Sequence, residues 1–304
     1  MAQLAGVSQT YMDPARREDL LDQIQDVSPD ANYLTTILGT VPVSQTLHEW
    51  TEYFTSRPTD NSGKTVEGDD NSFSDLTQLT RKNNIAQIIK EVFAVSETQV
   101  TVDKVSPKDA YAREMGWAMR RWKNKAEYAV LRGTKASGSS GVAREMNGIL
   151  AEVKANGLYT ARNSGTSLSE QEFRDIMADS WGATDEYLVD LILVTGARKQ
   201  DFGKFFTTST PKTIAADDKR LVQALNVIES DFGNLVEVRA HKNMESGSLI
   251  AMRKDLIKIG YLRKPKHVPN GVSGDAQKGH IVGELTTQVG SARPFVYRAT
   301  GYNL

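Results

Sequence analysis

Histidine is the side chain most often used for acid–base work and metal binding near neutral pH. This chain has four: His48, His241, His267 and His280. None lies four residues from another, and none has a carboxylate at metal-ligand spacing on a shared expected element. The stretch beginning His48-Glu49 also lacks the second histidine of an HExxH zinc motif. We therefore expect surface or structural roles for all four and no metal site.

The stretch Ser62-Gly63-Lys64-Thr65 imitates the end of a phosphate-binding loop. The full motif needs a glycine five residues before Gly63, where Pro58 stands instead. Neither a serine-nucleophile elbow nor a dinucleotide-binding glycine motif occurs. The 304 residues include no cysteine, which excludes disulfides and thiolate chemistry. The sequence thus indicates no active site and no cofactor, although it cannot pair carboxylates that lie far apart in the chain.

The first expected element is a weakly patterned segment, residues 1–44. A short helix is predicted at 16–24, and Tyr33–Leu38 form a small apolar cluster ended by Gly39. So short an apolar segment buries little surface alone, so we expect an arm that lies against something else. A capped helix packed on its own domain is the alternative.

Two strand-like runs, residues 45–54 and 86–101, flank a polar stretch at 55–84 that has few large apolar side chains. This order predicts a long hairpin with an extended tip. Loops of such length are uncommon in compact domains and usually serve a function or are disordered.

A long amphipathic helix is predicted at 107–132. Ser106 and Pro107 form a typical helix start, and Gly133 a typical stop. Apolar side chains recur every three or four residues, as at Met115 and Trp122, and predict one buried face. The opposite face is basic.

Residues 168–260 alternate helix-like and strand-like segments, as α/β domains do. The segments that we predict to be helices are 169–181, 197–206 and 217–228. The predicted strands are 190–195, 235–239, 248–252 and 257–263, followed in the tail by 280–289 and 295–299.

Charge is unevenly distributed along the chain. Residues 1–104 carry 8 Lys and Arg against 16 Asp and Glu, whereas residues 253–304 carry 9 against 3. The acidic front and the basic tail could attract each other within one chain or between neighbouring copies. Solvated faces without a partner are the alternative.

Taken in this order, the elements resemble the major capsid (major head) proteins of tailed bacteriophages, which have the Hong Kong 97-like fold. The resemblance covers nearly the whole chain. It is sharpest at seven short landmarks: Leu47-His48-Glu49-Trp50, Val66-Glu67-Gly68-Asp69-Asp70, Thr80-Arg81-Lys82-Asn83-Asn84, Val95-Ser96-Glu97-Thr98-Gln99, Glu127-Tyr128-Ala129-Val130-Leu131, Met146-Asn147-Gly148-Ile149 and Gly274-Asp275-Ala276-Gln277-Lys278-Gly279.

The resemblance implies an α+β fold and a non-enzymatic subunit that self-assembles into an icosahedral shell around double-stranded DNA. It implies five parts: an N-terminal arm (1–44), an extended hairpin loop (45–104), a peripheral domain with the spine helix 107–132 (105–167), an axial domain (168–255) and a return to the peripheral domain (256–304).

The implied partners are copies of the chain in pentamers and hexamers, a portal and packaged DNA, with no membrane. Because only about 44 residues precede the hairpin, we also expect a separate scaffolding protein. The resemblance implies a virion protein made in the host cytoplasm. The residues expected to contact neighbouring subunits lie on the hairpin and on the basic helix face: Trp50, Arg57, Lys64, Glu67, Asp69, Asp70, Arg81, Lys82, Arg113, Arg120 and Arg121.

Three other functions stay open at this point. A decoration or tail component of a particle would share the self-assembling character. An α/β enzyme would need a pocket lined by convergent Asp, His and Arg. A phosphate-backbone binder would use the basic helix and tail, although no recognisable nucleic-acid module is present.

Overall fold

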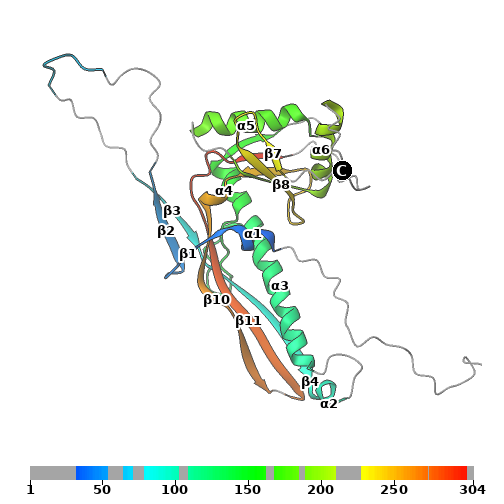
Figure 1. Ribbon diagram of the computed structural model, residues 1–304. Helices are drawn as coiled ribbons and strands as arrows, with labels where there is room; N and C mark the ends of the chain where they lie inside the picture. Colours follow the sequence, from blue (N-terminus) through cyan, green and yellow to red (C-terminus); the bar gives the residue numbers. More distant parts are fainter. Residues whose placement is uncertain are drawn as a thin grey trace, which may run out of the picture.

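The computed structural model shows an elongated molecule with a sheet at each end of a long helix and a thin projection at one side (Figure 1). It describes most of the chain, namely residues 32–53, 64–70, 79–102, 109–161, 168–184, 189–209, 227–272 and 274–299. No helix in these ranges is long and apolar enough to span a membrane.

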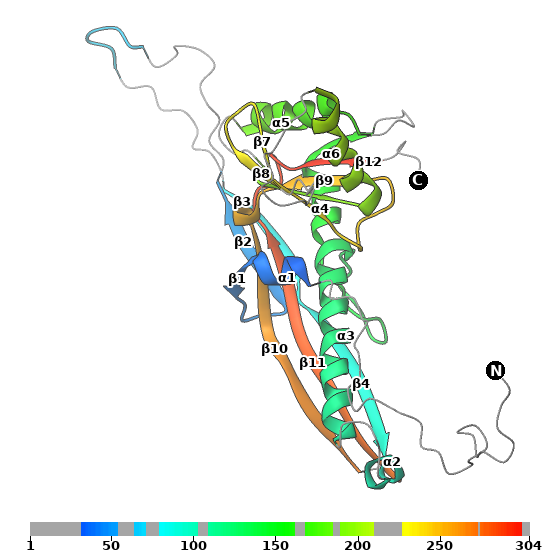
Figure 2. The same ribbon diagram turned by 45° about the vertical axis from the view of Figure 1, so that its right-hand side comes forward.

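One end is built on a four-stranded sheet in the order β1-β10-β11-β4. Strands β10 and β11 form a long antiparallel hairpin, β4 extends it, and β1 pairs in parallel with the start of β10. Helix α3 lies along this sheet (Figure 2). The bounds are Gly39–Pro42 for β1, Gln87–Ser96 for β4, Ile257–Val272 for β10 and Ala276–Val289 for β11.

Helix α3 (Ala110–Arg132) confirms the predicted long helix and its stop at Gly133. Its 23 residues make a rod about 34 Å long. The predicted start is wrong, because the cap is Asp109, whose Oδ1 accepts from the backbone N–H of Ala112 at 2.9 Å. Residues 103–108, with the predicted Ser106-Pro107 start, lie outside the described residues.

The buried face of α3 fits closely onto β11. Trp122 is 2% exposed, and its indole N–H donates to the Ile89 carbonyl at 2.8 Å. A Cβ added to Gly283 of β11 would lie 2.5 Å from Cζ2 of this ring. The absence of a side chain at Gly283 therefore leaves room for the Trp122 ring between α3 and the sheet.

The other end is a mixed six-stranded sheet in the order β5-β12-β9-β6-β8-β7, accompanied by α5 and α6. Ser169 caps α5 as predicted, accepting from the N–H of Glu172 at 3.3 Å. The bounds are Leu158–Ala161 (β5), Glu170–Thr184 (α5), Leu191–Val194 (β6), Gly196–Ser209 (α6), Val227–Glu229 (β7), Leu235–Ala240 (β8), Leu249–Met252 (β9) and Val296–Ala299 (β12). Short helices α4 (Ile149–Asn156) and η2 (Lys254–Leu256) connect the two sheets.

The two sheets share a core. One continuous cluster of buried apolar residues runs from Ile89 and Trp122 through Leu131 and Leu150 to Ile250 of the six-stranded sheet. A second cluster fills the space between the six-stranded sheet and its helices. The described chain is thus one packed body from which a hairpin projects.

The predicted pairing of the strands of that hairpin is wrong. Strand β2 (Leu47–Glu52) pairs with β3 (Thr80–Ile85), inside the stretch that we assigned to the polar tip. The run 86–101 instead supplies β4, which pairs with β11, and then α2 (Glu97–Thr101). The reason is that Ile89, Phe93 and Val95 alternate along β4 and are buried in the body. Similarly, 227–229 is strand β7 and not the end of a helix, while residues 217–226 lie outside the described residues.

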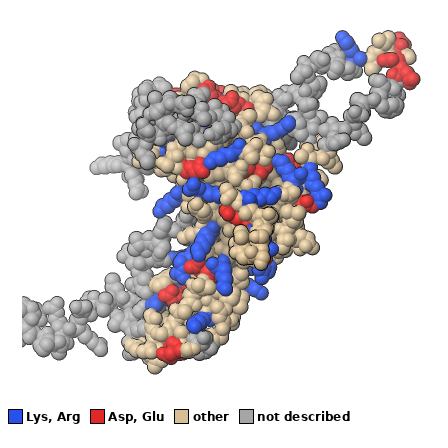
Figure 3. Space-filling view, turned by 180° about the vertical axis from the view of Figure 1, so that it is seen from behind, with Lys and Arg blue, Asp and Glu red and all other residues tan. Residues whose placement is uncertain are grey.

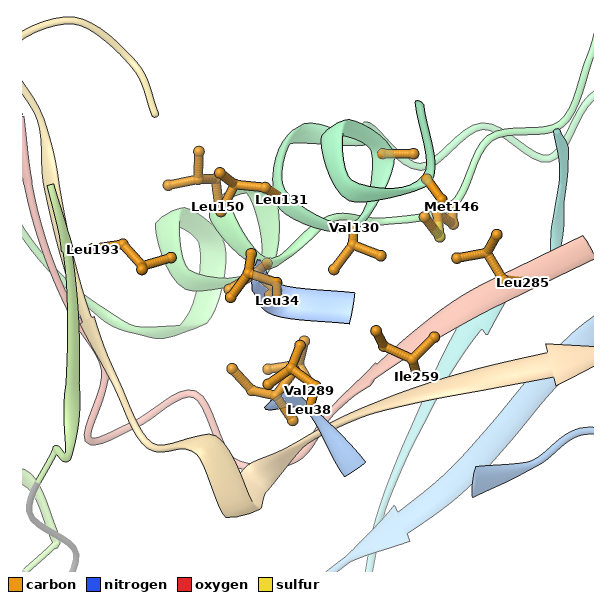
Figure 4. Packing of buried hydrophobic residues seen from close by; sticks show 14 of the residues in the cluster. Leu34, Leu38, Val130, Leu131, Met146, Leu150, Leu193, Ile259, Leu285 and Val289 are labelled. Carbon is orange, nitrogen blue, oxygen red and sulfur yellow. The ribbon is translucent and has the colours of Figure 1, made fainter. Parts of the chain in front are cut away.

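Of the expected arm, residues 33–44 pack on their own body, as the alternative predicts, although Asn32 makes no side-chain cap to the helix. Leu34 lies in α1 (Tyr33–Ile37) and is 0% exposed, and Leu38 directly follows the helix and is 5% exposed. Both side chains pack against α3 and the β10–β11 hairpin (Figure 4). This segment therefore folds onto its own body. The helix predicted at 16–24 lies outside the described residues.

Candidate assembly interface

The hairpin of β2 and β3 is a two-stranded ribbon that leaves the body beside β10 (Figures 1 and 2). Its inner face carries His48, Trp50 and Lys82, which are half-buried, whereas Glu49 and Arg81 on the other face are more exposed. A lone two-stranded ribbon is marginally stable in water. It therefore needs contacts at its base.

Asn84 supplies the main contact at the base. Its side-chain amide donates to the carbonyl oxygens of Thr287 and Asn147 at 2.7 and 3.1 Å. Its Oδ1 accepts from the backbone N–H groups of Ile85 and Asn147, both at 2.8 Å. Asn84 is 3% exposed, so these bonds are shielded from water. The ribbon is thereby fixed to β11 and to the loop before α4.

Three residues that we expected at subunit contacts lie farther out on the two strands of the ribbon and are held within the chain. The Lys82 ammonium lies 3.2 Å from Glu52 and 3.5 Å from Glu152. The indole N–H of Trp50 donates to Glu52 at 2.9 Å, and Arg81 pairs with Glu49. Their described contacts therefore stiffen the ribbon.

Four further expected residues lie together in residues 64–70, far out on the projection. Lys64, Glu67, Asp69 and Asp70 are all exposed. A turn forms where the N–H of Asp69 donates to the Val66 carbonyl at 3.1 Å, and Gly68 takes the left-handed φ of 83° that such a turn requires. Figure 3 shows the acidic side chains clustered there, well away from the body. Arg57 lies outside the described residues.

The basic face of α3 holds the remaining expected residues. Arg113 lies 3.7 Å from Glu114 and over the ring of Trp117, and Arg120 is exposed. Arg121 binds Glu91 of β4 at 2.7 Å, and Lys125 binds the same carboxylate. Burial alone would raise the pKa of Glu91, but the hydrogen bonds from Lys125 and Arg121 outweigh it and hold this pKa below 4.5. Part of this face thus joins the helix to the sheet.

Within the described residues, the histidines do not converge on one site. The four histidines have four separate partners: His48 contacts Gln288, His241 contacts Glu127, His267 contacts Tyr111 and His280 contacts Asn270. Nowhere in the described ranges do three potential metal ligands gather.

A sequence model of the family described as SU10 major capsid protein matches residues 5–296. The chain belongs to this family. A major capsid protein forms the shell of a virus particle, so this chain is a structural subunit found in the virion. Among the alternatives that the sequence leaves open, membership favours the capsid subunit over a decoration or tail component. No curated protein matches the sequence significantly.

Solved structures of two capsids and one encapsulin share the fold of this capsid protein. The capsid of a native GTA particle aligns with a TM-score of 0.70 at 11% identity, covering 97% of this chain and 99% of that one. The capsid of Myoviridae phage XM1 aligns with a TM-score of 0.65 at 11% identity and the same coverages. The SrpI encapsulin of Synechococcus elongatus aligns at 0.57, with 11% identity and 95% of both chains. The capsid protein therefore has the predicted Hong Kong 97-like fold.

Sequence reasoning missed a buried carboxylate that joins three parts of the capsid protein. Glu127 of α3 is 0% exposed. It accepts from the backbone N–H groups of Leu34 and Thr35 at 2.6 and 2.8 Å, and its Oε1 lies 3.0 Å from Nε2 of His241, which follows β8. Its signal in the sequence is a charged residue within the apolar face of a helix.

Replacing Asn84 by alanine is expected to loosen the ribbon without unfolding the capsid protein. The change leaves the backbone N–H groups of Ile85 and Asn147 without the Asn84 acceptor, at a total cost of about 1–3 kcal/mol once water enters at the base of the ribbon. Hydrogen exchange of the β3 amides should rise strongly in the N84A subunit. Asn83→Ala is the matched control, because Asn83 is exposed and its side chain binds only Lys135 among the described residues. Equal exchange in both variants would contradict the role of Asn84.

Proposed function

We propose that this capsid protein builds an icosahedral shell around double-stranded viral DNA, as pentamers and hexamers of the chain. The observation that carries the proposal is the projecting ribbon. Its base is fixed by buried hydrogen bonds of Asn84, while its described tip, residues 64–70, is exposed and has no apolar core of its own. A fixed projection of this kind suits a contact that each copy makes with the next, and such contacts close into rings and shells.

In this proposal the parts keep the roles that the resemblance implies. The ribbon and its tip form the extended loop that overlaps an adjacent copy, the four-stranded sheet and α3 form the peripheral domain, and α5, α6 and most of the six-stranded sheet form the axial domain. One strand of the C-terminal return, β12, pairs with β5 and β9 of the six-stranded sheet. We therefore propose that only β10 and β11 of the expected return, residues 256–304, belong to the peripheral domain.

The partners beyond further copies are also part of the proposal. The acidic tip would meet a basic surface of the adjacent copy, because blue side chains gather over the middle of the body in Figure 3. Exposed cations such as Arg120 would contact DNA phosphates without reading sequence. A scaffolding protein and a portal would take part in assembly in the host cytoplasm.

Negative-stain microscopy tests the proposal. The chain is expressed alone and together with its genomic neighbours, and each preparation is imaged. We expect closed particles, or five- and six-membered rings, in at least one preparation. Monomers alone in every preparation would reject the shell-forming role.

A further inference from the structure

Asparagine followed by glycine can react with its own backbone. The backbone nitrogen of the glycine attacks the side-chain Cγ of the asparagine, a C–N bond closes a succinimide ring, and the amide nitrogen leaves as ammonia with the glycine's amide proton. Water then opens the ring to aspartate or isoaspartate. Glycine favours ring closure because it has no Cβ and few conformational restrictions. The sequence contains three such pairs: Asn147-Gly148, Asn156-Gly157 and Asn270-Gly271.

The fold blocks this reaction at Asn147. The N–H of Gly148, whose nitrogen would be the nucleophile, donates to the Gly133 carbonyl at 2.9 Å, and Gly148 is buried. The Asn147 side-chain amide donates to Glu152 at 2.7 Å, and its backbone N–H donates to the buried Asn84. Ring closure at this position therefore requires the base of the ribbon to open first.

The second pair is held by the end of a helix. Asn156 is the last residue of α4, and the N–H of Gly157 donates to the Val153 carbonyl at 2.8 Å. The Asn156 side-chain amide donates to Glu152 at 2.7 Å. Although Asn156 is exposed, the glycine nitrogen beside it is therefore held by a helical hydrogen bond.

The third pair lies at the end of the β10–β11 hairpin that is farthest from the six-stranded sheet (Figure 2). The register of β10 with β11 stops after Pro269 and resumes at Val272, so Asn270 and Gly271 stand opposite Lys278 alone in a β-bulge. Both residues of the pair are exposed, and Gly271 has a left-handed φ of 73°. The strand pairing that protects backbone N–H groups is thus interrupted at this nucleophile.

His280 of β11 contacts the reacting amide directly. Its Nδ1 lies 2.5 Å from Oδ1 of Asn270, so the ring donates a hydrogen bond to the amide oxygen. This bond stabilises the negative charge that the oxygen gains when the glycine nitrogen attacks Cγ. Partial burial and the nearby Lys90 and His267 lower the pKa of His280. These basic neighbours favour a carboxylate at position 270 over the neutral amide.

We propose that Asn270 is a site of spontaneous conversion to aspartate and isoaspartate, and that His280 assists the ring closure. Asn147 and Asn156 keep their amides in the folded subunit. Each conversion adds a negative charge at the end of the hairpin, and the isoaspartate form also adds a methylene to the backbone of the bulge. The reaction takes place within one subunit, so this inference does not depend on the shell-forming function.

Timed incubation of the purified full chain at neutral pH and physiological temperature tests the site. Digestion and mass spectrometry with electron-transfer fragmentation, which distinguishes aspartate from isoaspartate, measure conversion at each of the three asparagines. Position 270 should convert roughly tenfold faster than positions 147 and 156, where local opening must first break the hydrogen bond of the glycine N–H. In urea the three rates should become similar. Conversion at position 270 that is no faster than at the other two in the folded subunit overturns the inference.

His280→Ala tests the assisting role. The variant should convert Asn270 several-fold more slowly in the folded subunit, because the amide oxygen loses its hydrogen-bond donor, and at the natural rate in urea. His48→Ala is the matched control, since His48 contacts Gln288 on the ribbon side of the sheet, and it should leave the rate unchanged. An unchanged or higher rate in folded His280→Ala overturns the assigned role of His280.

Asn270→Asp tests the setting of the product. In an NMR titration of the folded subunit, this variant should raise the pKa of His280, because the new carboxylate stabilises the charged ring. An unchanged pKa would show that the product carboxylate lies away from its basic neighbours and overturn their part in the inference.

Discussion

Replacing residues 53–79 by Asn-Gly is expected to abolish shell formation while leaving the subunit folded. Glu52 and Thr80 pair directly, so a two-residue turn can join β2 and β3 at this point. The change removes the exposed tip and spares Asn84 and its buried partners. In the co-expression experiment, electron microscopy should show no closed particles, and circular dichroism of the subunit should show a cooperative melt close to that of the natural chain.

Two controls define this result. A deletion of residues 57–84 should also prevent assembly, but with a clear loss of stability, since it removes β3 together with Asn84. Neutralising the acidic turn alone, by Glu67→Gln, Asp69→Asn and Asp70→Asn, should weaken assembly less than the replacement and make it less sensitive to salt. Normal particles from the Asn-Gly replacement would reject the assigned role of the tip.

The second large effect is expected at Glu127. Glu127→Ala leaves the N–H groups of Leu34 and Thr35 and the ring of His241 without their buried acceptor. Removing one member of a buried polar group costs about 3–5 kcal/mol of the free energy of unfolding. The urea midpoint of the subunit should fall accordingly, and exchange of the α1 amides should rise.

Glu114→Ala provides the matched control on the same helix. Glu114 is partly exposed and lies 3.7 Å from Arg113, a surface pair worth at most about 1 kcal/mol. Glu127→Gln keeps one oxygen acceptor and should lie between the two. A Glu127→Ala midpoint equal to that of Glu114→Ala would show that the packing of α1 does not depend on this carboxylate.

The sequence predicted the elements that have a strong period. Helix α3 was visible because Ala118, Trp122 and Ala126 recur along one face, and β6 because four apolar residues stand together. Local pattern was sufficient wherever burial follows a regular spacing.

Long-range contacts decided what the sequence could not predict. Strand β3 was not predicted because five of its six residues are polar. Its buried residue Asn84 binds Asn147 and Thr287, which lie 63 and 203 residues away in the chain. Glu127 stands out as a charge on the apolar face of the helix, but its partners Leu34 and His241 lie 93 and 114 residues away and could not be predicted. The start of α3 was misplaced because Ser106 and Asp109 are both good caps, and only the structure distinguishes them.

The route of the chain has a mechanical consequence. The backbone passes from the four-stranded to the six-stranded sheet before β5, returns before β10, and crosses again before β12. Three covalent connections and one continuous core therefore bear any tension applied between the ends of the molecule. A force that pulls on one end is distributed over the entire subunit, which resists stretching as a single stiff body.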